Sequence, residues 1–395
     1  MDSSEATASG NPIIVTFTKS GNAYEIDSKG IIKPSTPRDP STSNLTATEL
    51  AAIEANNSAN PTDKIEEITS RVTNTNLQDA TKIKAVLTGN VPIPVGANYK
   101  EGTVDTGVVI EYKSSEFVWV PVNSDLTVKG TTKAMARPST IEGLTTPDSN
   151  GRTNYEGVLY VYDYYDYNDY CMKVYSSSQV MSSYGQGTSG YREPDIVSNY
   201  DNNPGSLSTI NLTQSEFKTE IQENYNAMIE SVSKYGGFFV GRYETSIDPT
   251  TTVASKTAIP MNASENSQMW YGMYDKQKKF TTTTDVMQSS MIWGSQYDAM
   301  LNWMQAGGKD ITITDKGNHS GSPTMTGGTA TDIINNIYDL EGNLYEWTLE
   351  ANGSSTRSAR GSSYLVSYPI YNRTSSFYAY YTYNDLGTRL SLYIK

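Results

Sequence analysis

The pattern of apolar and polar positions divides the chain into a polar N-terminal part and a longer part rich in short strands. Between residues 13 and 33, apolar side chains alternate with polar ones around the sequence Ser-Gly-Asn at residues 20–22. This alternation predicts a β-hairpin with a Gly-Asn turn. Residues 34–43 carry three prolines and predict a linker. Residues 48–55 and 62–72 then have the apolar spacing of two short helices.

The pattern changes near residue 86, where the polar region gives way to short apolar runs. We therefore predict a hairpin segment at 1–33, a linker with short helices at 34–86, and one large domain at 87–395. Within this domain, residues 123–210 are polar and rich in Tyr, and we predict a large insertion there that contains some strand. The mixture of strands and helices predicts the α+β class.

Two helices are the clearest local predictions. Thr213-Gln214-Ser215-Glu216 has the form of a capping box, and apolar residues follow it at helical spacing until Gly236 and Gly237. Residues 295–298 repeat the capping signature before a second helix, which we expect to end at Gly307 and Gly308.

Composition narrows the possible chemistry. The chain has 395 residues, a net charge of −13, one Cys and one His. An acidic chain argues against nucleic-acid binding, because phosphate groups require a basic patch. One Cys and one His exclude an intrachain disulfide, a Cys/His zinc site and a three-His iron site. A Ser-His-Asp mechanism would need His319, whose Gly- and Ser-rich surroundings predict a solvated loop residue, so we expect no enzyme.

No apolar run approaches the roughly 18–20 residues that cross a bilayer. The first residues also lack the basic and apolar regions of a secretory signal. We therefore expect a protein that is cytoplasmic when made, leaves by another route, or is given without its leader.

Five short motifs follow one another along residues 104–395. They are the apolar strand at 117–122, Gly-Phe-Phe-Val-Gly-Arg-Tyr-Glu at 237–244, Asp-Leu-Glu-Gly-Asn-Leu-Tyr-Glu-Trp-Thr at 339–348, Arg-Gly-Ser-Ser-Tyr at 360–364, and Leu-Gly-Thr-Arg-Leu at 386–390. Their order resembles the formylglycine-generating-enzyme (sulfatase-modifying factor) family. This resemblance implies a C-type lectin fold of that type, with Arg360 and Arg389 in the framework. It does not imply the family's activity, because that chemistry uses a cysteine pair and this chain has only Cys171.

The variable proteins of diversity-generating retroelements use the same fold and bind ligands through a varied C-terminal surface. Their variable positions stay within the amino acids encoded by NNY codons, which exclude Lys, Gln, Glu, Met and Trp. These five types make up 69 of the 395 residues here, but residues 351–394 contain none of them, where the average would place about eight. The segment is compatible with such diversification, and ordinary compositional bias of a Tyr- and Ser-rich sheet is the alternative.

The C-terminal segment has the composition of an antibody-like binding surface. Tyrosine supplies a large contact area at low rotamer cost, while Ser and Asn adapt their hydrogen bonds. We predict ligand binding by Ser362, Tyr364, Tyr368, Tyr371, Asn372, Ser375, Ser376, Tyr378, Tyr380, Tyr381, Tyr383 and Asn384. We expect most of these tyrosines to be exposed, and cross-strand packing within a sheet is the alternative.

Asn343 and Glu346 lie in the box that binds calcium in some members of the resembling family. The resemblance therefore implies a possible calcium site with these two residues as ligands. The alternative is a turn followed by a buried Glu that accepts hydrogen bonds from backbone amides.

These observations favour an extracellular or cell-surface protein that binds a protein or glycan ligand on another cell or surface. A virion tail is the alternative location. Two other functions stay open: a structural pilin-like or phage-tail component, and an enzyme of the resembling family with an unrecognised site. The sequence has no heptad periodicity and leaves the oligomeric state undetermined.

The retroelement hypothesis makes a prediction about the gene's surroundings. We expect the source genome to encode a reverse transcriptase beside this gene, with a near-copy of its 3′ end that differs mainly at adenines. Sequencing of the locus checks this prediction. A locus that holds neither feature would leave the C-terminal composition as ordinary bias.

Overall fold

The structure is a computed structural model. It describes residues 75–87, 89–122, 207–248, 253–264, 268–351 and 356–395. It also describes short segments at 23–26, 32–35, 51–52, 125–128, 131–134, 158–161 and 173–176, and the single residues Ala55 and Ser58.

The N-terminal strands lie later in the chain than the predicted hairpin. β1 (Ala23–Ile26) and β2 (Ile32–Ser35) pair antiparallel, with Ala23 opposite Ser35. The predicted Gly-Asn turn therefore precedes the first paired strand, and residues 13–22 lie outside the described residues. Ala51, Ala52, Ala55 and Ser58 have helical backbone, as expected for the first of the two short helices, whereas residues 62–72 are outside the description.

The large sheet has six strands that are antiparallel throughout. Their order is β15 (Met287–Met291), β22 (Leu390–Ile394), β12 (Gly237–Gly241), β7 (Ser115–Pro121), β6 (Val109–Tyr112) and β5 (Asn98–Glu101). This arrangement confirms the buried strands predicted around residues 108–122 and after Gly237. β3 (Ile83–Leu87) and β4 (Val91–Pro94) form a neighbouring hairpin, so the boundary predicted near residue 86 falls inside a strand.

The helix after the predicted capping box is confirmed at both ends. α5 (Gln214–Tyr235) begins where the Glu216 amide donates to Thr213 Oγ1 at 3.3 Å and the Thr213 amide donates to Glu216 Oε2 at 2.8 Å. It ends at Gly236, whose φ of 84° is the left-handed conformation that glycine adopts without strain.

The second predicted helix begins slightly earlier than expected. α7 (Gly294–Ala306) starts before Ser295, because Gln296 Oε1 accepts from the Trp293 amide at 3.0 Å and so serves as the third residue of the helix. Three further helical segments are α6 (Trp270–Lys278) and the 3₁₀ turns η1 (Thr75–Gln78) and η2 (Leu207–Ile210). None of the described helices is long and apolar enough to cross a membrane.

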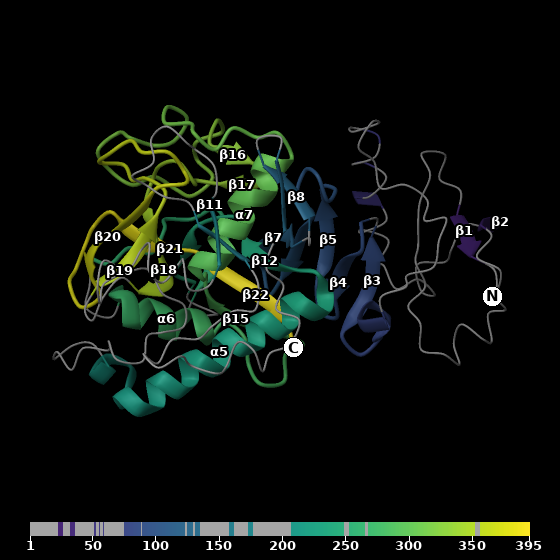
Figure 1. Cartoon of the computed structure of the whole chain (residues 1–395), viewed down its shortest axis with the longest axis horizontal. Helices are drawn as coiled ribbons and strands as arrows, with labels where there is room; N and C mark the ends of the chain where they lie inside the picture. The colour runs from purple at the N-terminus through teal and green to yellow at the C-terminus, as the bar shows by residue number, and fades with distance from the viewer. Residues whose placement is uncertain are drawn as a thin grey trace.

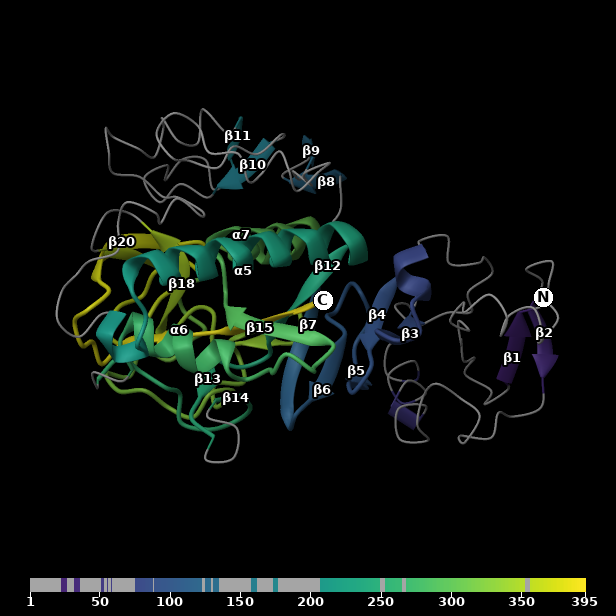
Figure 2. The same ribbon diagram turned by 90° about the horizontal axis from the view of Figure 1, so that it is seen from below.

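A smaller sheet of four strands lies at the opposite end of the domain from β3 and β4 (Figures 1 and 2). Its order is β20 (Arg373–Tyr378), β19 (Thr356–Arg360), β18 (Tyr345–Ala351) and β21 (Leu386–Thr388). β18 and β21 are parallel, and the other pairs are antiparallel. Only Arg389 separates β21 from β22, so the chain passes from the small sheet to the large one at this residue.

The remaining described strands form isolated pairs. They are β13 (Thr245–Ser246) with β14 (Ala254–Ser255), β16 (Ile333–Ile334) with β17 (Ile337–Tyr338), β8 (Asp125–Val128) with β9 (Thr131–Ala134), and β10 (Val158–Val161) with β11 (Lys173–Ser176). The last two pairs show that the predicted insertion at 123–210 contains some strand, while most of it lies outside the described residues.

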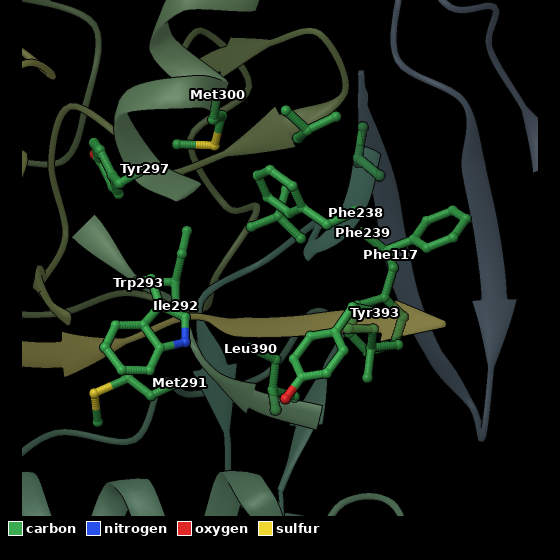
Figure 3. Close-up of a cluster of buried hydrophobic side chains, with 14 of the residues drawn as sticks. Phe117, Phe238, Phe239, Met291, Ile292, Trp293, Tyr297, Met300, Leu390 and Tyr393 are labelled. Atoms are coloured by element: carbon green, nitrogen blue, oxygen red, sulfur yellow. The ribbon is translucent and has the colours of Figure 1, made fainter. Parts of the chain in front are cut away.

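The core forms where the large sheet meets its helices. Figure 2 shows α5 and α7 along the same face of the large sheet, and Figure 3 shows the apolar side chains gathered around β22. Trp293 packs edge-on against Tyr225 of α5, with ring centroids 4.8 Å apart, and both rings are fully buried. Gly237 is required at the start of β12, because a Cβ there would lie 2.4 Å from the Val120 carbonyl oxygen. The protein therefore belongs to the α+β class and consists mostly of sheet.

Candidate ligand-binding surface

The site begins with a buried arginine at the junction of the two sheets. The Arg389 guanidinium donates through Nε to Glu346 Oε1 at 2.8 Å, through Nη1 to the Gly241 carbonyl at 2.9 Å, and through Nη2 to the Tyr338 carbonyl at 2.7 Å. Burial raises the pKa of Glu346, and the charge of Arg389 acts in the opposite direction. Arg389 thus holds the end of β12, the start of β18 and β17 together, as expected for a framework residue.

A second buried centre is the side chain of Asn343. Its Oδ1 accepts from the Thr324 amide at 2.8 Å, and its Nδ2 donates to a carboxylate oxygen of Glu244. The other oxygen of Glu244 accepts from the Leu344 amide at 2.9 Å. Burial raises the pKa of the Glu244 carboxyl well above its ordinary value. Residues from two of the sequence motifs, 237–244 and 339–348, therefore meet at one place in the interior.

Each of the two residues expected to bind calcium has one oxygen that accepts from a protein donor, while Glu346 Oε2 has no hydrogen-bond partner among the described residues. Oδ1 of Asn343 accepts from Asn318 Nδ2 at 3.0 Å, and Glu346 Oε1 is ion-paired with Arg389. Calcium binding by these atoms would require those donors to be displaced. Within the described part of the chain, no group of three or more His, Cys, Asp or Glu side chains is arranged to hold a metal ion. Asn343 fits the alternative of a buried turn, whereas the buried Glu346 accepts from the Arg389 guanidinium instead of from backbone amides.

The loop between β19 and β20 is closed at its base by buried residues that we expected to contact ligand. Asn372 Nδ2 donates to the Gly361 carbonyl at 3.0 Å, and the Asn372 carbonyl accepts from Arg360 Nε at 3.1 Å. Ser362 Oγ accepts from the Tyr368 amide at 2.9 Å. Ser362 and Asn372 are buried. Their side chains form hydrogen bonds within this loop and do not face solvent.

Two of the seven tyrosines are buried, contrary to the exposure expected of them. Tyr364 and Tyr371 are each 6% exposed. The backbone explains the position of Tyr364: its amide donates to the Asn343 carbonyl at 2.8 Å, and its carbonyl accepts from the Gly321 amide at 3.1 Å. Both side chains therefore pack inside the protein, although they lie in the loop between β19 and β20 and not in a strand.

Tyr383 is partly buried and supports the next loop. Its hydroxyl accepts from the Tyr378 amide at 3.1 Å, and its amide donates to the Ala263 carbonyl at 2.8 Å. Its ring packs edge-on against Phe377, with centroids 5.0 Å apart. Burial raises the pKa of the Tyr383 hydroxyl. Tyr383 thus holds the loop between β20 and β21 through these contacts.

The other tyrosines reach solvent, as expected. Tyr378 is 41% exposed, Tyr381 is 52% exposed, and Tyr380 is partly exposed. Their rings pack against one another, with centroid separations of 5.6 Å for Tyr378 and Tyr380, 5.2 Å for Tyr378 and Tyr381, and 4.9 Å for Tyr380 and Tyr381. Such contacts limit the freedom of each ring before any ligand binds.

Tyr368 and Asn384 complete the exposed set, on two loops that are tied together. Tyr368 is 37% exposed, and Asn384 is exposed in the following loop. The Asp385 carboxylate joins the loops by accepting from Ser363 Oγ at 3.3 Å. We call Tyr368, Tyr378, Tyr380, Tyr381 and Asn384 the tyrosine surface. Ser375 and Ser376 lie in β20, and their side chains are outside the description.

The single histidine is not the solvated loop residue that the sequence predicted. His319 Nε2 lies 2.6 Å from Glu341 Oε1, and Nδ1 lies 2.9 Å from the Ser363 carbonyl oxygen. Glu341 follows no spacing rule relative to His319, so the sequence carried no signal for this pair. Both ring nitrogens are engaged, and His319 instead connects two loops beside the tyrosine surface.

Comparisons with known proteins do not identify a relative. No protein-family model matches the chain, and no curated protein matches it. Among solved structures, a crystal structure of CarF is similar to 40% of this chain and 76% of its own, with 13% sequence identity and a TM-score of 0.23. A similarity at that score carries no argument about fold or function.

Buried carboxyl groups near Arg389 predict that the stability of the protein depends on pH. Burial raises the pKa of Asp332 from its ordinary value near 3.8 to about 7, and the nearby Asp339 adds to this effect. The folded protein therefore binds more protons than the unfolded chain between about pH 4 and pH 7, so this residue lowers the free energy of unfolding as the pH rises through that range.

We predict that Asp332→Asn removes this fall in the free energy of unfolding. The side-chain oxygen of the substituted asparagine carries no charge at any of these pH values and can still accept from the backbone N–H of Glu341. At pH 8 the variant should be more stable than the wild type by an amount on the order of a few kcal/mol, and the two should converge towards pH 4. Urea unfolding across this pH range measures the difference. Asp315→Asn, at an exposed carboxylate, is the matched control and should leave the profile unchanged. Parallel profiles for Asp332→Asn and wild type would refute the prediction.

Proposed function

We propose that this protein is a ligand-binding module of the receptor or adhesion type, and that the tyrosine surface is its contact site. One observation carries the proposal: Tyr378 and Tyr381 are exposed, Tyr380 is partly exposed, and the three rings pack against one another beside the hydrogen bond from the Tyr378 amide to the Tyr383 hydroxyl. Large side chains are usually buried, so an exposed group of three rings needs a reason other than folding.

Tyrosine suits such a site for physical reasons. A phenol ring offers a large apolar contact and a hydrogen-bonding hydroxyl, and it loses few rotamers when a ligand covers it. Rings that already contact one another lose still less freedom on binding. Asn384 beside them can donate and accept, which adapts the surface to polar groups on a ligand.

The frame below this surface supports the proposed C-type lectin fold of the formylglycine-generating-enzyme type. Glu244, Asn343, Glu346, Arg360 and Arg389, which we call the frame, come from four separated motifs of the resemblance. All five are buried, and four of them are joined in the two hydrogen-bonded centres described above. Convergence of distant motifs on a small region is what a shared fold requires.

The proposal extends to how the surface is generated and where it acts. The tyrosine surface lies entirely within residues 351–394, the segment without Lys, Gln, Glu, Met or Trp. Diversification by a retroelement would therefore change the contact residues while the frame residues Glu244, Asn343 and Glu346 stay outside the segment. We propose a protein or glycan ligand on another cell or surface, met at the cell surface or on a virion tail.

Binding is favoured over catalysis by the use of the one histidine. Both ring nitrogens of His319 face protein acceptors, Glu341 and the Ser363 carbonyl, so the ring connects two loops and does not face a nucleophile as a catalytic base would.

We predict that replacing Tyr378, Tyr380 and Tyr381 by Ala reduces ligand binding by at least about 100-fold, because truncation of central aromatic residues removes most of an interface's energy. Fluorescently labelled protein is applied to a glycan array and to a panel of intact bacterial cells, and saturable binding is measured. Stability should change less than binding does, since Tyr378 and Tyr381 keep 41% and 52% of their surface exposed in the folded protein.

The matched control replaces the exposed Val95 and Ile247 by Ala, outside the tyrosine surface. This double variant should bind like the wild type. The proposal fails if the triple variant binds as well as the control, or if the wild type shows no saturable binding to either array or cells.

A further inference from the structure

His319 lies between two oxygen atoms that only accept hydrogen bonds. A carbonyl oxygen, that of Ser363, faces Nδ1 at 2.9 Å, and a carboxylate oxygen, Oε1 of Glu341, faces Nε2 at 2.6 Å. A neutral imidazole has one N–H and one lone pair, so it can satisfy only one of two acceptors. A proton must therefore lie on each of these two nitrogen–oxygen lines.

The carboxylate on this line is itself held in place. Oε2 of Glu341 accepts from the Lys316 amide at 2.8 Å and also from the Gly317 amide. Glu341 is fully buried, and its own amide donates to Asp332 Oδ2 at 3.1 Å. The Glu341 carboxylate is thus held in one orientation. It cannot turn away from His319 when the ring loses a proton and the two lone pairs repel each other.

The other charged groups around the ring lie on its own loop and on the loops beyond Ser363. Lys316 and Asp315 precede the histidine and pair with each other, with Nζ and Oδ2 3.6 Å apart. On the far side, Asp385 accepts from Ser363 Oγ, and the Tyr364 hydroxyl lies near enough for Asp385 to raise its pKa in addition to burial. Among the described residues, Glu341 is the charged group that contacts the imidazole directly.

The contact connects the loop of His319 to the loop that carries Tyr368. The Gly321 amide donates to the Tyr364 carbonyl at 3.1 Å, and Ser367 Oγ donates to the Thr314 carbonyl, so the two loops lie along each other. Ser363 is buried at the base of the second loop, and the exposed part of this loop begins at Leu365 and includes Tyr368. Only four residues separate Ser363 from Tyr368, so a contact that orders the Ser363 carbonyl acts close to the tyrosine surface.

We propose that His319 is a positioning residue of the tyrosine surface: in its doubly protonated form it clamps residues 361–369 against residues 316–321, and it releases them when the second proton is lost. Loss of the Nε2 or Nδ1 proton places a nitrogen lone pair against an oxygen lone pair, which repels. The clamp therefore orders the Tyr368 loop at acidic pH and loosens it as the pH rises.

This inference rests on the proposed function only in assigning Tyr368 to a ligand site. The clamp itself is a property of the unbound protein and is tested without any ligand. A protein that has the clamp but binds nothing would refute the proposed function and leave the clamp intact. A protein that binds ligand but lacks the clamp would refute the clamp and leave the proposed function intact.

The chain has one histidine, which gives a direct spectroscopic test. Protein labelled with ¹⁵N in the histidine ring yields one pair of ring-nitrogen signals. As the pH is raised over the range in which the protein stays folded, both nitrogens should first show the shifts of N–H, and one should then lose its proton in a single transition. A ring that carries one proton throughout this range would overturn the proposal.

The same transition should appear in the loop. Amide hydrogen exchange of residues 361–369, corrected for the intrinsic effect of pH, should speed up by about tenfold as the second proton is lost, since a charge-assisted hydrogen bond is broken. Strand β12 is the internal reference and should not change. Exchange in the loop that does not follow the ring transition contradicts the clamp.

Two variants separate the clamp from a general role in stability. His319→Gln offers one donor group to two acceptors, and the loop should exchange rapidly at every pH, without a transition. Lys316→Ala removes a neighbouring charge on the same loop while its amide still donates to Glu341, and it should keep the wild-type profile. If His319→Gln keeps a pH-dependent loop, the assignment to His319 is wrong; if that variant does not fold, the ring signals of the wild type still decide.

Discussion

The buried ion pair between Arg389 and Glu346 is the contact on which the rest of the structure depends. Removing two charges from water is costly, and a buried pair is stable only when further hydrogen bonds satisfy its remaining groups. Arg389 meets this condition with the carbonyls of Gly241 and Tyr338. Because Arg389 alone separates β21 from β22, this one side chain fixes how the small sheet meets the large one.

The position of the tyrosine surface follows from that constraint. β18 is held by Glu346, β19 and β20 pair onto it in turn, and the loops at their ends therefore start from fixed points. Asn343 and Asn372 then determine the path of the loop after β19, while Tyr383 supports the loop after β20. The contacts described for the frame residues do not involve the exposed rings of Tyr378 and Tyr381.

Much of the local structure could be predicted from the sequence, because it depends on neighbouring residues. The capping box at Thr213 and the stop at Gly236 involve groups within one helical turn, and both are confirmed. The continuous apolar run at 117–122 also predicted a buried strand correctly, since burial on both faces leaves no alternation.

The predictions that failed concern contacts between distant segments. Tyr364 and Tyr371 have the same local composition as the exposed tyrosines, but the backbone of Tyr364 is bonded to the distant residues Asn343 and Gly321. His319 sits in a loop-like sequence, and its partner Glu341 lies 22 residues away with no periodic relation. The start of α7 was missed for a local reason instead, because Gln296 reaches back three residues to the Trp293 amide.

The central claim is that a buried frame holds the tyrosine surface without depending on it. The most direct measurement is the thermal unfolding of a set of variants in which Tyr378, Tyr380, Tyr381 and Asn384 are randomised together over the amino acids of NNY codons. The account predicts that most members fold, with midpoints within a few degrees of the wild type, as surface substitutions usually change stability by less than about 0.5 kcal/mol each. If most members fail to fold, those side chains belong to the structure's own packing and the account is wrong.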